Sequence, residues 1–135
     1  MAFLLDTNAC IQFLRHRDSA VGRKLATVSY QDVVLCSVVK AELYYGVQRG
    51  SQPDQDMVTL RQFLANFVSL PFDDRAAEEY GRIRAQLARQ GNLIGPNDLM
   101  IAAIAVVHNA ILVTHNTREF SRVRDLQVVD WEAVP

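Results

Sequence analysis

The sequence predicts an α/β domain whose central sheet is mainly parallel and covered by helices on both faces. Short apolar runs rich in β-branched residues alternate with longer segments whose apolar residues recur at helical spacing. Strands separated by helices in this way form βαβ units, and such sheets are mainly parallel and buried on both faces. The 135 residues, half of them hydrophobic, suit one compact domain over residues 1–135.

The first seventy residues are expected to contain three strands and four helices. A short apolar strand covers residues 2–5, a β-branched strand covers Val33–Cys36, and Val68–Leu70 is short enough to be an edge strand. The helices are expected at Asn8–Arg15, Ala20–Val28, Val38–Gln48 with Ser37 as its N-cap, and Pro53–Phe67.

The remaining residues continue the alternation. A long amphipathic helix begins after a cap at Asp73 or Asp74 and ends at Gln90, because Gly91 suits a helix stop. The next helix has Pro96 near its first turn, runs to about Asn109, and is apolar nearly all round, so it should be buried. The last elements are expected to be a strand at Ile111–Thr114, a short helix at Arg118–Val123, a strand at Val128–Val129, and Trp131 packing the tail.

Composition excludes several classes of protein. No segment is apolar over a length that would cross a membrane, and the apolar run at the amino terminus is too short for a signal peptide because Asp6 interrupts it. The net charge of −1 excludes a polycation, so nucleic-acid binding would need a local basic surface or a metal ion. Cys10 and Cys36 lie in apolar patterns without a CxxC motif, which indicates buried thiols in the cytoplasm.

Side chains with oxygen ligands recur where predicted strands end or helices begin. Asp6 ends the first strand, Glu42 lies about one turn into the helix after the second strand, and Asp98 lies in the first turn of the buried helix. Asn116 follows the strand that ends at Thr114. Ligands of open α/β sheets bind at the carboxyl ends of the strands, so we expect these four side chains in one cleft.

Each of these residues also has an ordinary structural explanation. Asp98 suits a first helical turn, Glu42 a solvated helix face, and Asp6 an N-cap or Asx turn. Their common edge favours function, because clustered carboxylates repel one another and need a cation such as Mg²⁺, which prefers oxygen ligands. Such an ion activates water and neutralises charge on phosphorus, so the sequence predicts metal-assisted hydrolysis of a phosphodiester.

Four segments resemble the successive motifs of PIN-domain proteins, most closely the VapC toxins of bacterial VapBC toxin–antitoxin modules. They read LLDTNACI, SVVKAELYYG, GPNDLMIAAIA and LVTHNTREFSRV with LQVVDW, and the resemblance extends from Phe3 to Trp131. It implies a three-layer α/β/α fold and an endoribonuclease that depends on Mg²⁺ or Mn²⁺. Asp6, Glu42 and Asp98 match the three main acidic positions of the family, which are its metal ligands.

The resemblance also implies partners. Family members often form homodimers and are inhibited by a VapB-type antitoxin whose C-terminal segment enters the active-site groove. The stretches IGPNDLMIAA and NTREFSRV resemble the branch that includes enteric VapC toxins, which implies a transfer RNA as the target, with the initiator tRNA as the first candidate.

One position departs from the family pattern. Many PIN domains carry a fourth acid just past the fourth strand, where this chain reads His115-Asn116-Thr117. Asn116 supplies an amide oxygen but no charge, which favours one tightly held ion over two. Glu119 is a candidate replacement, although a charge on the helix surface is the simpler interpretation.

Other functions remain to be weighed. A degenerate PIN domain that binds RNA or protein without cutting is favoured by Asn116 and opposed by the three retained acids. A receiver-like domain would need a phosphoacceptor Asp after the second strand and a late Lys, and a phosphatase would need Asp-x-Asp near Asp6; neither is present. None of the histidines is assigned to catalysis; His115 lies near the expected cleft and could contact phosphate or a base, although a partly exposed loop residue is the simpler interpretation. The cations that could contact RNA are Arg15, Arg17, Arg82, Arg84, Arg89, Arg118, Arg122 and Arg124.

Overall fold

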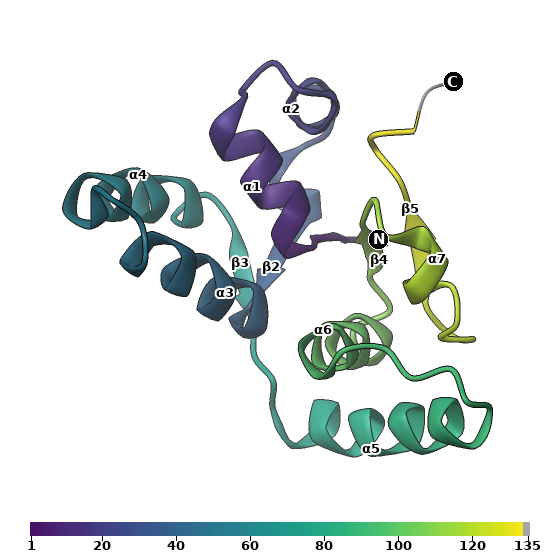
Figure 1. Ribbon diagram of the computed structural model, residues 1–135. Helices are drawn as coiled ribbons and strands as arrows, with labels where there is room; N and C mark the ends of the chain where they lie inside the picture. Colours follow the sequence, from purple (N-terminus) through teal and green to yellow (C-terminus); the bar gives the residue numbers. More distant parts are fainter. Residues whose placement is uncertain (134–135) are drawn as a thin grey trace.

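The computed structural model describes residues 1–133 as one five-stranded sheet with helices packed against it (Figure 1). The strands are β1 (Phe3–Leu5), β2 (Val33–Cys36), β3 (Val68–Leu70), β4 (Ile111–Val113) and β5 (Gln127–Val129). The helices are α1 (Thr7–Arg15), α2 (Ala20–Leu25), α3 (Ser37–Gln48), α4 (Pro53–Leu64), α5 (Asp74–Arg89), α6 (Pro96–Val107) and α7 (Thr117–Phe120), and a 3₁₀ turn, η1, covers Tyr30–Asp32.

All strand pairs are parallel, in the order β3-β2-β1-β4-β5. The first strand is therefore central, and its residue Leu4 pairs with Val34 on one side and Leu112 on the other. Figure 1 shows α1 and α2 on one side of the sheet and α5 and α6 on the other, with α3 and α4 extending to the left. The predicted three-layer α/β/α arrangement is confirmed.

The core lies where α6 passes under the sheet. Leu4 and Leu5 of β1 are fully buried, and α6 contributes Leu99 and the run Ile101–Ala105. This explains why α6 is apolar nearly all round, since α5 covers its other side. Trp131 packs its ring against Phe3 with centroids 5.3 Å apart, so the predicted anchoring of the tail is also confirmed.

Several helix ends differ from the sequence prediction. Ser37 is the first residue of α3, and Cys36 occupies the N-cap position without a side-chain hydrogen bond. The fourth helix ends at Leu64 instead of Phe67, because the chain must become extended before Val68 to pair with β2. Phe67 is nevertheless buried, as its place in the apolar stripe predicted.

Two helix boundaries agree with their sequence signals. Asp73 caps α5 by accepting a hydrogen bond from the Ala76 backbone N–H at 3.0 Å. Gly91 has φ of +67°, the left-handed conformation that ends a helix and that favours glycine. Both cysteines are buried free thiols. Among the described helices, none has the length and hydropathy of a membrane span.

Candidate active site

Asp6 lies where β1 leads into α1, and it is the most buried acid of the described chain at 5% exposure. Its Oδ1 accepts a hydrogen bond from the Ala9 backbone N–H at 2.8 Å, so it caps α1 as well as ending the strand. Burial raises the pKa of Asp6, while the Thr114 hydroxyl and the Ala9 N–H favour its charged form. The structural explanation offered for Asp6 therefore holds, and it leaves a carboxylate held at the sheet edge.

Glu42 connects the start of α1 to the start of α6. The Thr7 hydroxyl donates to Glu42 Oε1 at 2.5 Å, and the Asn97 side-chain amide approaches Oε2 at 3.5 Å. Because Thr7 follows Asp6 and Asn97 precedes Asp98, these bonds link the neighbourhoods of all three predicted acids. Glu42 is half-buried, so it is not an ordinary solvated helix residue.

The pKa of Asp98 is influenced by the other acids of this edge. Its pKa is raised to about 6, first by burial and then by the negative charges of Glu42, Glu119 and Asp6. Electrostatic influence of this kind requires proximity, since charges in a protein interact strongly only over short distances. The structure thus brings Asp6, Glu42 and Asp98 to the same edge of the sheet.

Asn116 and Glu119 follow β4, the strand that pairs with β1 on the side opposite β2. The Asn116 backbone N–H donates to Thr114 Oγ1 at 3.0 Å, and its side-chain amide donates to Glu119 Oε2 at 3.0 Å. Glu119, which the sequence leaves open between a replacement acid and a surface charge, is half-buried, and its charge adds to the effects that raise the pKa of Asp98. The short helix α7 accounts for this, because its single turn places residue 119 where it accepts the hydrogen bond of the Asn116 side chain. Asn116 orients a fourth acid without supplying a charge.

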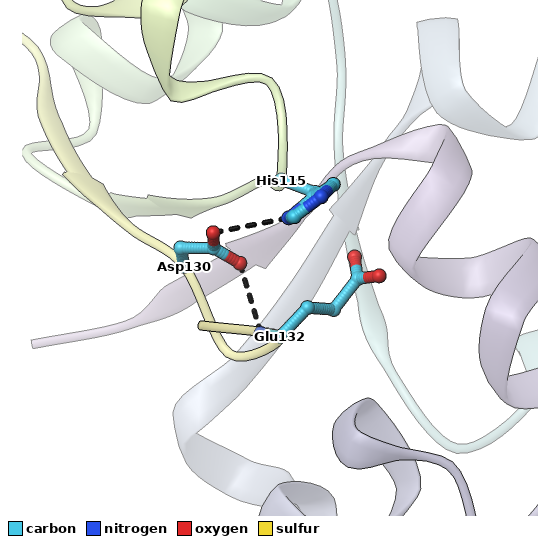
Figure 2. Close-up of side chains that lie close together, drawn as sticks. All are labelled: His115, Asp130 and Glu132. Carbon is cyan, nitrogen blue, oxygen red and sulfur yellow. Dashed lines mark hydrogen bonds and ion pairs between the residues drawn. The ribbon is translucent and has the colours of Figure 1, made fainter. Parts of the chain in front are cut away.

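A second group of side chains lies beside the first. Within residues 1–133, only His115, Asp130 and Glu132 bring three potential metal ligand atoms within 4.8 Å of one another (Figure 2). Asp6, Glu42 and Asp98 do not approach one another that closely, as expected for like charges that repel. Glu132 also raises the pKa of Asp6, so the two groups border each other at the ends of β1, β4 and β5.

A cleft of about 690 Å³ opens beside the acids. It lies between α1, α3 and α6, and its polar lining includes Thr7, Asn8, Glu42 and Asn97. Arg49, at the end of α3, adds a cation that the sequence analysis missed, although its position two turns after Glu42 on the same helix was a usable signal.

Several arginines expected to contact RNA are turned to other partners. Arg82 binds Glu79 and Asp125, Arg84 donates to the Tyr80 hydroxyl, and Arg122 donates to the Leu93 carbonyl. Arg82 and Arg84 are exposed and Arg122 is half-buried, so the bonds of the first two contribute little to stability. None of these three arginines lines the cleft beside Glu42.

The donor set suits a hard divalent cation. It consists of carboxylate oxygens, with hydroxyl and amide groups beside them, which Mg²⁺ and Mn²⁺ prefer over soft ligands. Within the described residues, none of Asp6, Glu42 and Asp98 forms a salt bridge with a basic side chain. A cation would relieve the repulsion that raises the pKa of Asp98.

Comparison with known proteins assigns the chain to a protein family. The family model for the PIN domain matches residues 3–126, so the chain belongs to the PIN-domain family. Within that family it groups with the VapC ribonucleases. A protein from Shigella flexneri named tRNA(fMet)-specific endonuclease VapC is 38% identical over 97% of this chain and 98% of its own length.

A second relative and a solved structure support the same grouping with VapC proteins. Ribonuclease VapC2 of Rickettsia felis is 35% identical, over 98% of this chain and 99% of its own length. The crystal structure of VapBC2 from Rickettsia felis, bound to a DNA fragment from the promoter, contains a chain that superposes with a TM-score of 0.91. That chain is 32% identical, and the match covers 97% of this protein and 99% of that chain.

Proposed function

We propose that this protein is a metal-dependent endoribonuclease, the toxin of a VapBC-type toxin–antitoxin system, whose site is formed by Asp6, Glu42 and Asp98. The observation that carries the proposal is the pair of hydrogen bonds from Thr7 and Asn97 to Glu42, which links the positions of Asp6, Glu42 and Asp98 at one sheet edge. The names of the relatives support the ribonuclease activity. We also propose that the protein acts in the cytoplasm, where its two buried thiols would stay reduced.

Asp6, Glu42 and Asp98 would hold Mg²⁺ or Mn²⁺. When bound, such an ion supplies an activated water near neutral pH and neutralises charge that develops on the phosphate. Thr7 holds the Glu42 carboxylate in place, and the Ala9 N–H holds that of Asp6. Asn116 holds Glu119 at the rim, where it adds a fourth negative group. These bonds fix the oxygens before RNA binds, which lowers the cost of assembling the site.

A transfer RNA is the proposed substrate, because the Shigella flexneri relative is named for tRNA(fMet). A single-stranded loop suits the open cleft, since proteins read unpaired RNA bases far more readily than paired ones. The non-catalytic alternative loses its main support, because Asn116 has a role in orienting Glu119.

A VapB-type antitoxin is the proposed protein partner, supported by the VapBC complexes among the similar structures. The cleft offers apolar contacts at Ile11, Tyr45 and Met100 beside Glu42, which suits a segment with apolar and basic side chains. We also propose a homodimer, on the family resemblance. Light scattering of the purified protein, alone and with the antitoxin, tests both assemblies.

The test of the nuclease is a cleavage assay on a pool of cellular tRNA. We expect cleavage with Mg²⁺ or Mn²⁺, none with a chelator, and a loss of more than about 100-fold in Asp6→Asn, beyond what outer-shell changes cause. The control is Asp18→Asn, an exposed acid remote from the cleft, which should cleave normally. Cleavage that persists in the chelator or in the Asp6 variant would overturn the metal mechanism.

A further inference from the structure

His115 lies where the loop after β4 meets the acidic edge. Its neighbour Thr114 favours the charged form of Asp6, and its neighbour Asn116 holds Glu119. The negative charge of Asp6 also contributes to raising the pKa of His115, after a larger effect from Asp130. The imidazole therefore lies within electrostatic reach of the proposed nuclease site.

The ring is oriented by groups that follow β5 (Figure 2). His115 Nδ1 lies 3.0 Å from Asp130 Oδ2, and Nδ1 must be the donor because an ionised carboxylate can only accept. The other oxygen, Asp130 Oδ1, accepts the Glu132 backbone N–H at 2.8 Å. The carboxylate is thus fixed on one side and directs the imidazole on the other. Nε2, on the opposite edge of the ring, points away from Asp130.

This arrangement contributes little to the fold. The His115 side chain is 64% exposed, and an ion pair at such a surface adds almost nothing to stability. The tail is already anchored by Trp131 against Phe3. Because stability does not explain why Asp130 orients the His115 ring, we look for a ligand that binds to Nε2.

The charge around the site indicates which ligand. The acids repel RNA phosphates, so basic groups must flank them to hold the strand. Arg49 serves the α3 side of the cleft, while Arg82 and Arg122 bind groups of the protein. On the β4 side, His115 presents a hydrogen-bond donor beside the acids. Asp130 favours its cationic form, which strengthens a bond to phosphate.

We propose that His115, oriented by Asp130, is a substrate-binding residue that donates a hydrogen bond from Nε2 to a phosphate oxygen of the RNA beside the acidic site. This deepens the proposed function and rests on it for the identity of the ligand. Asp130 acts through the imidazole and is a positioning residue.

The first experiment measures binding of a fluorescein-labelled tRNA pool in the presence of a chelator, so that binding is separated from cleavage. His115→Ala should weaken binding about ten-fold, as expected for the loss of one charge-assisted hydrogen bond. The dependence of log Kd on log salt should fall by about one phosphate contact. His108→Ala, an exposed histidine at the far end of α6, is the matched control and should leave binding unchanged.

Further variants separate contact from folding. His115→Gln should recover part of the affinity, because its amide can still donate to phosphate. Asp130→Asn should weaken binding less than His115→Ala and should have no added effect in the double variant. With Mg²⁺ present, His115→Ala should raise KM more than it lowers kcat. Thermal unfolding of all variants should match the wild type.

Three results would overturn the inference: His115→Ala binding like His108→Ala, Asp130→Asn acting independently of His115, or excess Mn²⁺ restoring His115→Ala. The last would show that His115, Asp130 and Glu132 hold a cation instead of phosphate. A protein that binds RNA through His115 but never cleaves it would refute the nuclease and leave this inference intact. Cleavage that is independent of His115 would refute this inference and leave the nuclease intact.

Discussion

At the carboxyl ends of its strands the protein buries a carboxylate and a hydroxyl, Asp6 and Thr114, whereas at the amino ends it stacks aromatic rings. The ring of Phe63 lies 5.5 Å from that of Phe13 and 5.1 Å from that of Phe67, which in turn contacts Tyr30. Asp6 and Thr114 are the buried polar residues of the described chain, and both lie at the same edge.

The difference shows how stability and activity are separated along one sheet. Burying acids at this edge disfavours their charged forms, first through lost hydration and then through mutual repulsion, and both effects raise the pKa of Asp6 and of Asp98. Aromatic packing removes apolar surface from water and adds favourable ring contacts, which offsets that cost. Substitutions at the amino edge should therefore change the free energy of unfolding, and substitutions at the carboxyl edge should mainly change catalysis.

The largest expected effect is on stability, from Phe63→Ala at the amino edge. It should lower the free energy of unfolding by about 3–5 kcal/mol, because it leaves a cavity between two rings. Activity per folded molecule should stay the same. Denaturant unfolding measures the loss, with the half-buried Phe72→Ala as a milder control. Equal losses in the two variants would contradict a special role for the amino edge.

The next effect is the stabilisation of the carboxyl edge by a divalent ion. At pH 7.5, Mn²⁺ at about 100 times its dissociation constant should add about 2.7 kcal/mol to the free energy of unfolding. Asp6→Asn should lose most of this gain. Differential scanning calorimetry with and without chelator is the measurement, and an unchanged melting temperature in the wild type would argue against a cation at this edge.

A smaller effect concerns the pH dependence that Asp98 causes. Its folded pKa of about 6 lies above the ordinary 3.8, so its contribution to stability is complete below about pH 3.8 and is lost as pH rises through about 6. In a chelator, Asp98→Asn should match the wild type near pH 4 and exceed it above pH 6 by roughly 1 kcal/mol, allowing for solvent screening. Unfolding across this pH range, with Asp18→Asn for comparison, tests the direction. A variant less stable at every pH would make Asp98 a structural residue.

The smallest effect is expected for Thr7→Val, which removes the hydroxyl that holds Glu42. Cleavage should fall by about three-fold, since one neutral–charged hydrogen bond is lost and the carboxylate can be re-solvated. The exposed Thr27→Val, whose hydroxyl binds the Lys24 carbonyl, should cleave normally. If the Thr7 variant is fully active, Glu42 does not need this support.

Sequence reasoning predicted the fold well because hydrophobic period and strand spacing are local signals. Continuous runs of apolar residues predicted the buried helix α6 and the central strand β1, because an element at the surface would expose such residues to water. Helix ends were less certain, as at Phe67, because pairing of β3 with β2 overrides the local helical stripe. The sheet order requires contacts between distant segments, which a single sequence does not contain.

The candidate site was predictable in part. Asp6, Glu42 and Asp98 were found because strand ends and helix starts converge in a parallel sheet. The sequence leaves the role of Glu119 open, since only the turn of α7 shows that Glu119 accepts a hydrogen bond from Asn116. Asp130 and Glu132 gave no signal, because their importance depends on the position of β5 beside β4.

The central position of β1 has a consequence for how the enzyme is made. Asp6 is synthesised almost at the start of the chain, whereas β4, which pairs with β1, and Glu119 are synthesised near the end. Contacts so distant along the chain form late, and domains fold as units during translation. A growing polypeptide should therefore lack the complete acidic edge until β4 and residue 119 have been synthesised, and we expect ribonuclease activity to appear only after that point.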